Sequence, residues 1–155
     1  MGSVRTPSSS ATARAVVPHI VVRDARAAID FYVRAFGAVE AFRLTEPSGK
    51  VGHAELTIDG ARFMLADEYP DFGALSPAAT GGTPVALQCY VADVDAFVER
   101  AVNAGATLLR PVRDEFYGDR TGTLQDPFGH KWHFATKKEE VPPAEMQRRW
   151  SAILT

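Results

Sequence analysis

The sequence has little cysteine and contains no long apolar run. Cys89 is the only cysteine among 155 residues, so no disulfide framework within the chain can hold the fold. No run of 18 apolar residues occurs, which excludes a membrane-spanning helix of ordinary length. The formal net charge is -2, so neither nucleic acid nor an anionic membrane is an expected partner. These absences predict a cytoplasmic protein.

What remains is the composition of one compact domain, because 46% of the residues are hydrophobic. The first stretch, MGSVRTPSSSATAR at 1–14, is rich in serine, threonine and alanine and lacks the apolar centre of a secretory signal. We expect a disordered N-terminal tail there.

One pattern occurs twice along the chain. In each copy a β-branched strand leads to an aspartate, Asp24 or Asp93, at the position of a helix N-cap. Apolar residues then follow at helical spacing. A glycine suited to the left-handed C-cap, Gly37 or Gly105, ends each helix and leads into another strand. The two copies lie at 20–42 and 89–109.

Each copy is followed by a predicted hairpin. Residues 51–66 read as two strands around the turn Asp59-Gly60, and residues 120–136 as two strands around the turn DPFG. Each half is therefore a βαβββ module, and the fold class is α+β with a pair of curled mixed sheets.

The module boundaries follow from this pattern. The modules cover about 15–68 and 84–138, and a linker rich in proline, glycine and serine separates them at 69–83. In the C-terminal segment 139–155 we expect an amphipathic helix from Pro143 to Leu154, with the proline in its first turn. Its apolar stripe is expected to pack on the domain or on a partner.

The duplicated βαβββ plan resembles the vicinal oxygen chelate superfamily, which includes glyoxalase I, bleomycin-resistance proteins and extradiol dioxygenases. The stretches GGTPV, FYGDRTGTLQDPFGHKW and KKEEVPPAEMQRR look most like its PhnB-like branch. The resemblance implies a homodimer and two facing cups that enclose a small ligand. It does not imply one activity, because this fold hosts lyases, dioxygenases, thiol transferases and non-catalytic drug binders. The matching stretches are RDARAAIDFYVRAFGA, GHAEL, GGTPV, FYGDRTGTLQDPFGHKW and KKEEVPPAEMQRR.

The resemblance also implies where a metal would bind. Metal-dependent members carry one ligand on the first strand and one on the last strand of each module. Those positions fall at Val17, Met64, Ala86 and His133 in this sequence. Three of the four cannot bind a divalent ion, so the sequence departs from the metalloenzyme pattern.

A shifted set of ligands remains open at this point. His19 and Gln88 lie two residues beyond Val17 and Ala86, and residues i and i+2 of a strand share a face. His53 and Glu55 share a face in the same way. The set His19, His53, Glu55, Gln88 and His133 could therefore hold a metal in another register.

The sequence thus favours a protein that binds a small organic molecule in a cup, without a metal or other cofactor. The alternative is a metal-dependent lyase or dioxygenase with shifted ligands, and whether the protein is an enzyme stays open. The residues expected to line the cup are His19, His53, Glu55, Met64, Gln88, Tyr90 and His133.

Three further residues receive structural interpretations. His130, directly after DPFG, is expected to be exposed and without a role. Cys89 alternates with two polar neighbours and is expected to face the helices as a small buried residue. Arg120 is expected to form a salt bridge with Asp119 or Glu115.

Overall fold

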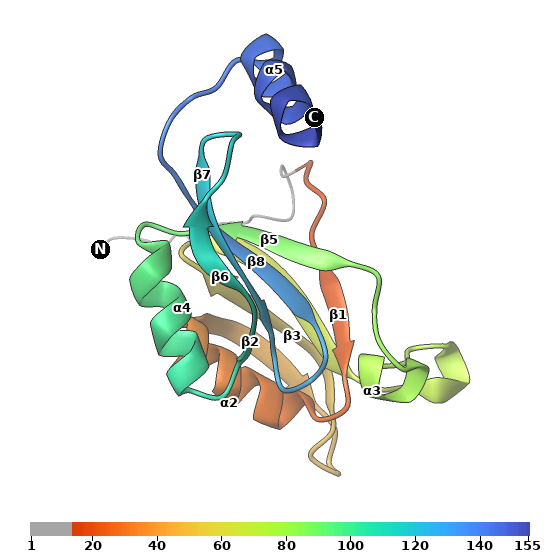
Figure 1. Ribbon diagram of the computed structural model, residues 1–155. Helices are drawn as coiled ribbons and strands as arrows, with labels where there is room; N and C mark the ends of the chain where they lie inside the picture. Colours follow the sequence, from red (N-terminus) through yellow and green to blue (C-terminus); the bar gives the residue numbers. More distant parts are fainter. Residues whose placement is uncertain (1–13) are drawn as a thin grey trace.

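The computed structural model describes residues 14–155, so all but the last residue of the predicted N-terminal tail lie outside the described residues. The described chain forms two βαβββ units in sequence, and Figure 1 shows them with a helix at the C-terminus that projects from the second unit. The first unit contains β1 (His19–Val22), α2 (Ala25–Phe36), β2 (Val39–Thr45), β3 (Val51–Ile58) and β4 (Ala61–Asp67). The second contains β5 (Ala86–Tyr90), α4 (Val94–Asn103), β6 (Thr107–Asp114), β7 (Asp119–Gln125) and β8 (Lys131–Lys137).

The predicted helix starts are confirmed. The side chain of Asp24 accepts a hydrogen bond from the Ala27 N–H at the start of α2, and Asp93 accepts one from the Ala96 N–H at the start of α4. Gly37 ends α2 in the left-handed conformation. The C-terminal end of α4 differs from the prediction of a glycine cap. Helix α4 ends at Asn103, and its cap is Ala104 in the right-handed conformation, one position before Gly105.

Each unit forms its own four-stranded mixed sheet. The strand orders are β1-β4-β3-β2 and β5-β8-β7-β6, and the first strand of each unit runs parallel to its last strand. The tight turn at Asp59 and Gly60 has positive φ at both residues, 52° and 86°, as the two-residue hairpin requires. The two sheets thus repeat one plan, as the sequence predicts.

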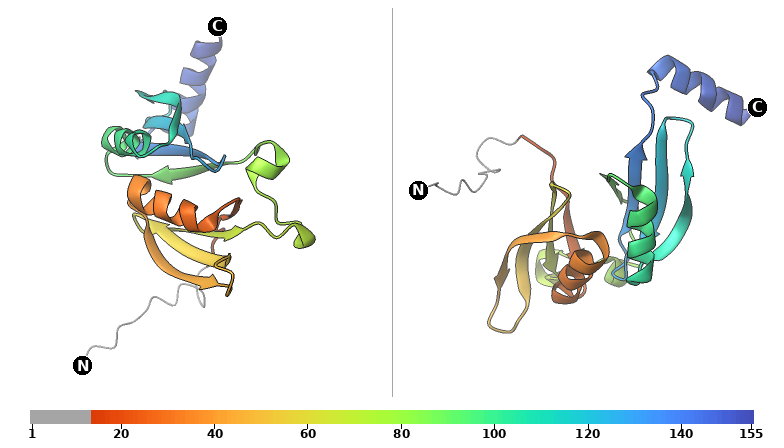
Figure 2. Two further views of the ribbon diagram at one scale, coloured as in Figure 1. Left: turned by 90° about the horizontal axis from the view of Figure 1, so that it is seen from below. Right: turned by 90° about the vertical axis from the view of Figure 1, so that its left-hand side faces the viewer.

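Helix α2 lies between the two sheets (Figure 2). It packs on all four strands of its own unit. Its other side meets β8, where the Phe36 ring centroid is 5.1 Å from that of Trp132 and 4.9 Å from that of Phe134. Helix α4 covers the same side of the second sheet. The helix-covered faces of both sheets therefore point toward each other.

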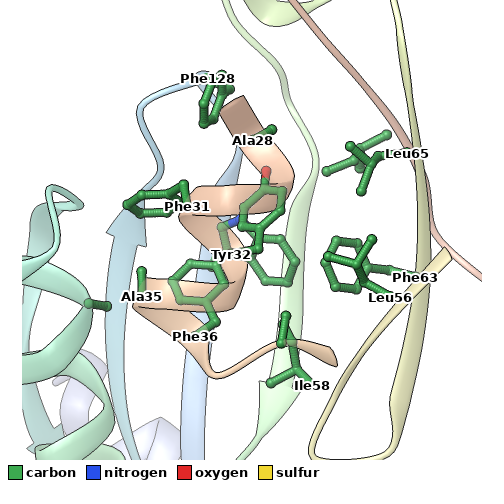
Figure 3. Close-up of a cluster of buried hydrophobic side chains, with 14 of the residues drawn as sticks. Ala28, Phe31, Tyr32, Ala35, Phe36, Leu56, Ile58, Phe63, Leu65 and Phe128 are labelled. Carbon is green, nitrogen blue, oxygen red and sulfur yellow. The ribbon is translucent and has the colours of Figure 1, made fainter. Parts of the chain in front are cut away.

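The core is aromatic around this helix (Figure 3). Tyr32 and Phe36 stack with ring centroids 5.5 Å apart, and Phe63 of β4 contacts Tyr32 edge to face at 5.5 Å. Trp132 meets Tyr32 at 5.7 Å from the other sheet. One apolar core consequently joins the two units, in which edge-to-face ring pairs add to the apolar burial.

The DPFG turn is part of this junction. Both carboxylate oxygens of buried Asp126 accept hydrogen bonds. Oδ2 accepts from the Tyr32 hydroxyl at 2.6 Å and from Trp132 Nε1 at 2.9 Å, while Oδ1 accepts from the backbone N–H groups of Phe128 and His130. The buried carboxylate between the units thus has hydrogen-bond donors on both of its oxygens.

The segment between the units, predicted as a linker, contains two short helices, η1 (Pro70–Phe72) and α3 (Pro77–Thr80). Ser76 is fully buried and both its hydroxyl and its N–H donate to the Glu68 carboxylate. The predicted C-terminal helix is present as α5 (Pro143–Leu154). No helix in the described part of the chain is long and apolar enough to cross a membrane.

Candidate functional site: two half-cups

Strand alternation gives each sheet one face covered by helices and one open face. On β3 the residues Ala54 and Leu56 are fully buried toward α2, whereas His53 and Glu55 lie on the opposite face and are half-buried. The pairing register aligns four strands in one row across this open face. The row contains Phe42, Glu55, Met64 and His19.

The open face of the first unit offers rings and one ion pair. His19 and His53 stack with ring centroids 5.7 Å apart, and the Phe42 ring lies 5.8 Å from His53 on the other side. Glu55 accepts a hydrogen bond from Arg62 at 3.1 Å. The face therefore combines aromatic rings, on which a planar group could stack, with the Glu55 carboxylate, which is already paired with Arg62.

The open face of the second unit carries more hydrogen-bonding groups. Gln88, His133 and Thr123 occupy one row across β5, β8 and β7. The Thr123 hydroxyl lies 2.8 Å from His133 Nδ1, which leaves Nε2 for other partners. Arg110 continues the row on β6. Thr123 and Arg110 were not among the site residues predicted from the sequence.

A hydrogen-bond chain runs beside this row. Gln88 Nε2 donates to the Tyr90 hydroxyl oxygen at 3.3 Å, and that hydroxyl donates to Asp119 Oδ2 at 2.7 Å. Asp119 is 3% exposed, whereas Tyr90 is 53% exposed. The hydrogen bond to Asp119, together with burial, raises the pKa of Tyr90, so this residue stays a neutral phenol. Sequence reasoning missed Asp119 as a site residue, because its burial depends on strand pairing.

The two open faces point away from each other. Trp132 and Phe134 face α2, so His133 between them faces outward on the far side of the second sheet. On the first sheet Glu55 faces outward in the opposite direction. One chain thus carries two open sheet faces with α2 between them (Figure 2), each called a half-cup after the cup that the sequence predicts. The seven predicted lining residues are brought together as two sets, not one: His19, His53, Glu55 and Met64 on the first sheet, and Gln88, Tyr90 and His133 on the second.

The donor set fits a divalent ion poorly. The positions that the family resemblance implied hold Val17, Met64, Ala86 and His133, of which His133 alone suits such an ion. The register places His19 beside Met64 and Gln88 beside His133. Even so, residues 14–155 contain no group of three or more His, Cys, Asp or Glu side chains able to hold a metal. Within one chain the shifted set does not converge.

Of the three structural interpretations from the sequence, the one for His130 was wrong, and the one for Arg120 predicted a salt bridge correctly but named the wrong partners. His130 is half-buried, and its Nε2 lies 2.8 Å from the Val21 carbonyl oxygen, so it links the two units. Arg120 pairs with Asp95 and Asp114, because alternation on β7 turns it toward α4 while Asp119 faces the open side. The third interpretation is confirmed, since Cys89 is buried, and burial raises the pKa of its thiol.

Comparison with known proteins agrees with this architecture. The family model of the Glyoxalase/Bleomycin resistance protein/Dioxygenase superfamily matches residues 13–134. The chain belongs to this superfamily. An uncharacterized protein of Mycobacterium tuberculosis is 46% identical over 141 residues, which cover 89% of this chain and 83% of that protein. An uncharacterized protein of Arabidopsis thaliana is 33% identical over 123 residues, covering 74% and 72% of the two chains.

Solved structures show the same fold. TioX from Micromonospora sp. ML1 superimposes with a TM-score of 0.63 at 28% identity, covering 83% of this chain and 99% of TioX. The Arabidopsis thaliana gene product has a TM-score of 0.61 at 30% identity, covering 78% and 97%. The fosfomycin resistance protein FosX from Listeria monocytogenes shares the fold at 16% identity, with a TM-score of 0.59 and coverage of 85% and 96%.

Proposed function

We propose that this superfamily member, of the PhnB-like branch, binds a small organic molecule without a glyoxalase-type metal, in a cup that two copies of the chain complete. The single observation that carries the proposal is the outward placement of two different half-cups. The first offers the stacked rings of His19 and His53, and the second offers the polar row at Gln88 and His133. A ligand between such faces would be held by stacking on one side and by hydrogen bonds on the other.

Exposed apolar side chains support closure by a second copy. Phe42 is 44% exposed and Leu44 is 60% exposed on the open face of the first sheet. Tyr90 is more than half exposed on the other. Large apolar groups gathered on one face of a sheet commonly mark an interaction surface. Twofold symmetry would bring the first half-cup of each copy to the second half-cup of its partner, giving two identical cups per homodimer.

The proposal is tested by measuring ligand binding to variants on each of the two open faces. Planar aromatic fragments are titrated against the full chain, and dissociation constants are measured by ligand-detected NMR. His53→Ala removes a ring from one half-cup and Gln88→Ala removes a polar group from the other. Each is expected to weaken the same fragments, whereas Glu99→Ala on the exposed side of α4 is the matched control without effect. Fragments sensitive to one face alone would contradict a shared cup.

Elemental analysis tests whether the protein binds its ligand without a metal. The tag-free protein is purified without chelator and compared with His133→Ala. We expect no stoichiometric divalent metal in either preparation, because the donor set does not suit one. About one equivalent of Zn, Ni, Mn or Fe that disappears in His133→Ala would overturn the proposal in favour of a metal-dependent lyase or dioxygenase.

A further inference from the structure

The second half-cup contains a buried carboxylate oxygen without a hydrogen bond. Oδ1 of Asp119 accepts none from any residue that the structure describes. The nearest cation is Lys137, whose Nζ lies 4.0 Å away. Among the described residues, the Tyr90 hydroxyl is therefore the hydrogen-bond donor on which this buried carboxylate depends.

Asp119 fixes the orientation of the Tyr90 hydroxyl. A phenol has one proton, and Tyr90 donates it to Asp119 Oδ2. The phenol oxygen therefore presents lone pairs, one of which accepts from Gln88 Nε2 in a longer contact of 3.3 Å. The charge on Asp119 polarises the phenol and strengthens its oxygen as an acceptor, because hydrogen bonds in a chain reinforce each other. The exposed tip of Tyr90 is consequently an acceptor and not a donor.

We infer that Tyr90, held in this orientation by Asp119, selects ligands that present a hydrogen-bond donor, such as an amine or amide N–H. This inference rests on the proposed function, since it assumes that the open face of the second sheet lines a ligand cup. Tyr90 is the contact residue and Asp119 is a positioning residue. Ligands that offer only acceptors at this point leave the phenol oxygen without a partner and bind more weakly.

Matched fragment pairs test the selection. One pair is benzamide and N,N-dimethylbenzamide, which are both neutral. The other is benzylammonium and trimethylbenzylammonium, which carry equal charge but differ in the N–H donor. We expect the wild-type chain to prefer the N–H member of each pair by about fivefold, the effect of one net hydrogen bond. Fluorine NMR of the chain labelled with 3-fluorotyrosine locates binding, since the chain has four tyrosines and Tyr90→Phe assigns the signal.

Variants separate selection from a merely structural role. Tyr90→Phe removes the acceptor, so the ratio of affinities within each pair should fall to that set by size alone. In Asp119→Asn the side-chain amide can donate to the phenol oxygen and release the phenol proton toward the ligand, so the preference for N–H donors should also disappear. The double variant Tyr90→Phe/Asp119→Asn avoids an unpaired buried charge if the single Tyr90 variant unfolds. Tyr69→Phe, in the segment between the units, is the matched control.

The outcomes distinguish this inference from the function on which it rests. Equal binding of both members by the wild type, or a preference that survives in Tyr90→Phe or Asp119→Asn, overturns the inference and leaves the cup in place. Fragments that bind nowhere on the open faces overturn the proposed function and the inference with it.

Discussion

The hydroxyl of Tyr32 donates to the carboxylate of Asp126 across the junction of the two units, at 2.6 Å and out of contact with solvent. Tyr32 belongs to the helix of the first unit, and Asp126 opens the DPFG turn of the second. The two residues are 94 positions apart in sequence. Together with the aromatic core around Trp132, this bond joins the two units.

Removing the hydroxyl tests the strength of this junction. Tyr32→Phe keeps the ring and its aromatic neighbours but leaves Asp126 Oδ2 with Trp132 Nε1 as its remaining donor. We expect the free energy of unfolding to fall by about 1.5–3 kcal/mol, as for hydrogen bonds to charged groups. Urea denaturation measures it. Tyr69→Phe, whose hydroxyl lies outside this core, provides the comparison, and an equal effect of both variants would contradict the account.

Stability at high pH should depend on the same residue. Burial, followed by the nearby Asp126 charge, raises the pKa of Tyr32 well above its ordinary value. The unfolded chain then releases this proton at lower pH than the folded chain. The contribution to stability is therefore full below about pH 10, the pKa of an unperturbed tyrosine, and is lost progressively at higher pH. The difference in unfolding free energy between wild type and Tyr32→Phe should shrink above that pH. A constant difference up to pH 11 would contradict this.

Gly118 should tolerate no side chain. A Cβ there would lie 2.3 Å from the Glu139 carbonyl oxygen, and φ is +98°. Gly60 has a similar φ of +86° with open space around it. Gly60→Ala should cost about 1–2 kcal/mol for the left-handed conformation, and Gly118→Ala should cost about 1–3 kcal/mol more for the clash. Thermal and urea unfolding of both variants measure the difference. Equal costs would show that the segment 138–141 does not pack on this turn.

The C-terminal helix contacts the second unit through residues in its middle. Trp150 contacts the Phe116 ring at 5.4 Å, and Arg149 donates to the Phe116 carbonyl oxygen and to Glu139. We expect Trp150→Ala to lower amide-exchange protection across α5, with less than about 1 kcal/mol lost from global stability. Ile153, 60% exposed at the far end, is the control position. If Ile153→Ala lowers protection as much as Trp150→Ala, the ring contact is not the anchor.

Local signals predicted the elements well. The aspartate caps, the glycine at the end of α2 and the Asp59-Gly60 turn depend on near neighbours in sequence, so each could be inferred from a few residues. Alternation also assigned correct faces to His53, Glu55 and Cys89. These properties do not depend on how the sheets pack together.

The rest depended on contacts between distant residues. His130 looked like an exposed turn residue because its partner, the Val21 carbonyl, belongs to the other unit. Asp119 looked like a partner for Arg120, but adjacent residues of a strand face opposite ways. The seven residues predicted to line the cup fall into two outward sets because α2 lies between the sheets, and strand periodicity does not encode that position.

Paramagnetic relaxation between two copies tests the shared cup most directly. A nitroxide is attached at Lys131→Cys, on the open face of the second sheet, in chains without ¹⁵N. The label goes to this position because Cys89 is buried and reacts poorly. These are mixed with ¹⁵N-labelled chains that carry no nitroxide. The account predicts broadening of amide signals from β1, β3 and β4 of the labelled copy, around His19 and His53, and none when the nitroxide is at Glu99→Cys on α4. Absence of broadening between copies from Lys131→Cys, or equal broadening from both sites, would contradict the account.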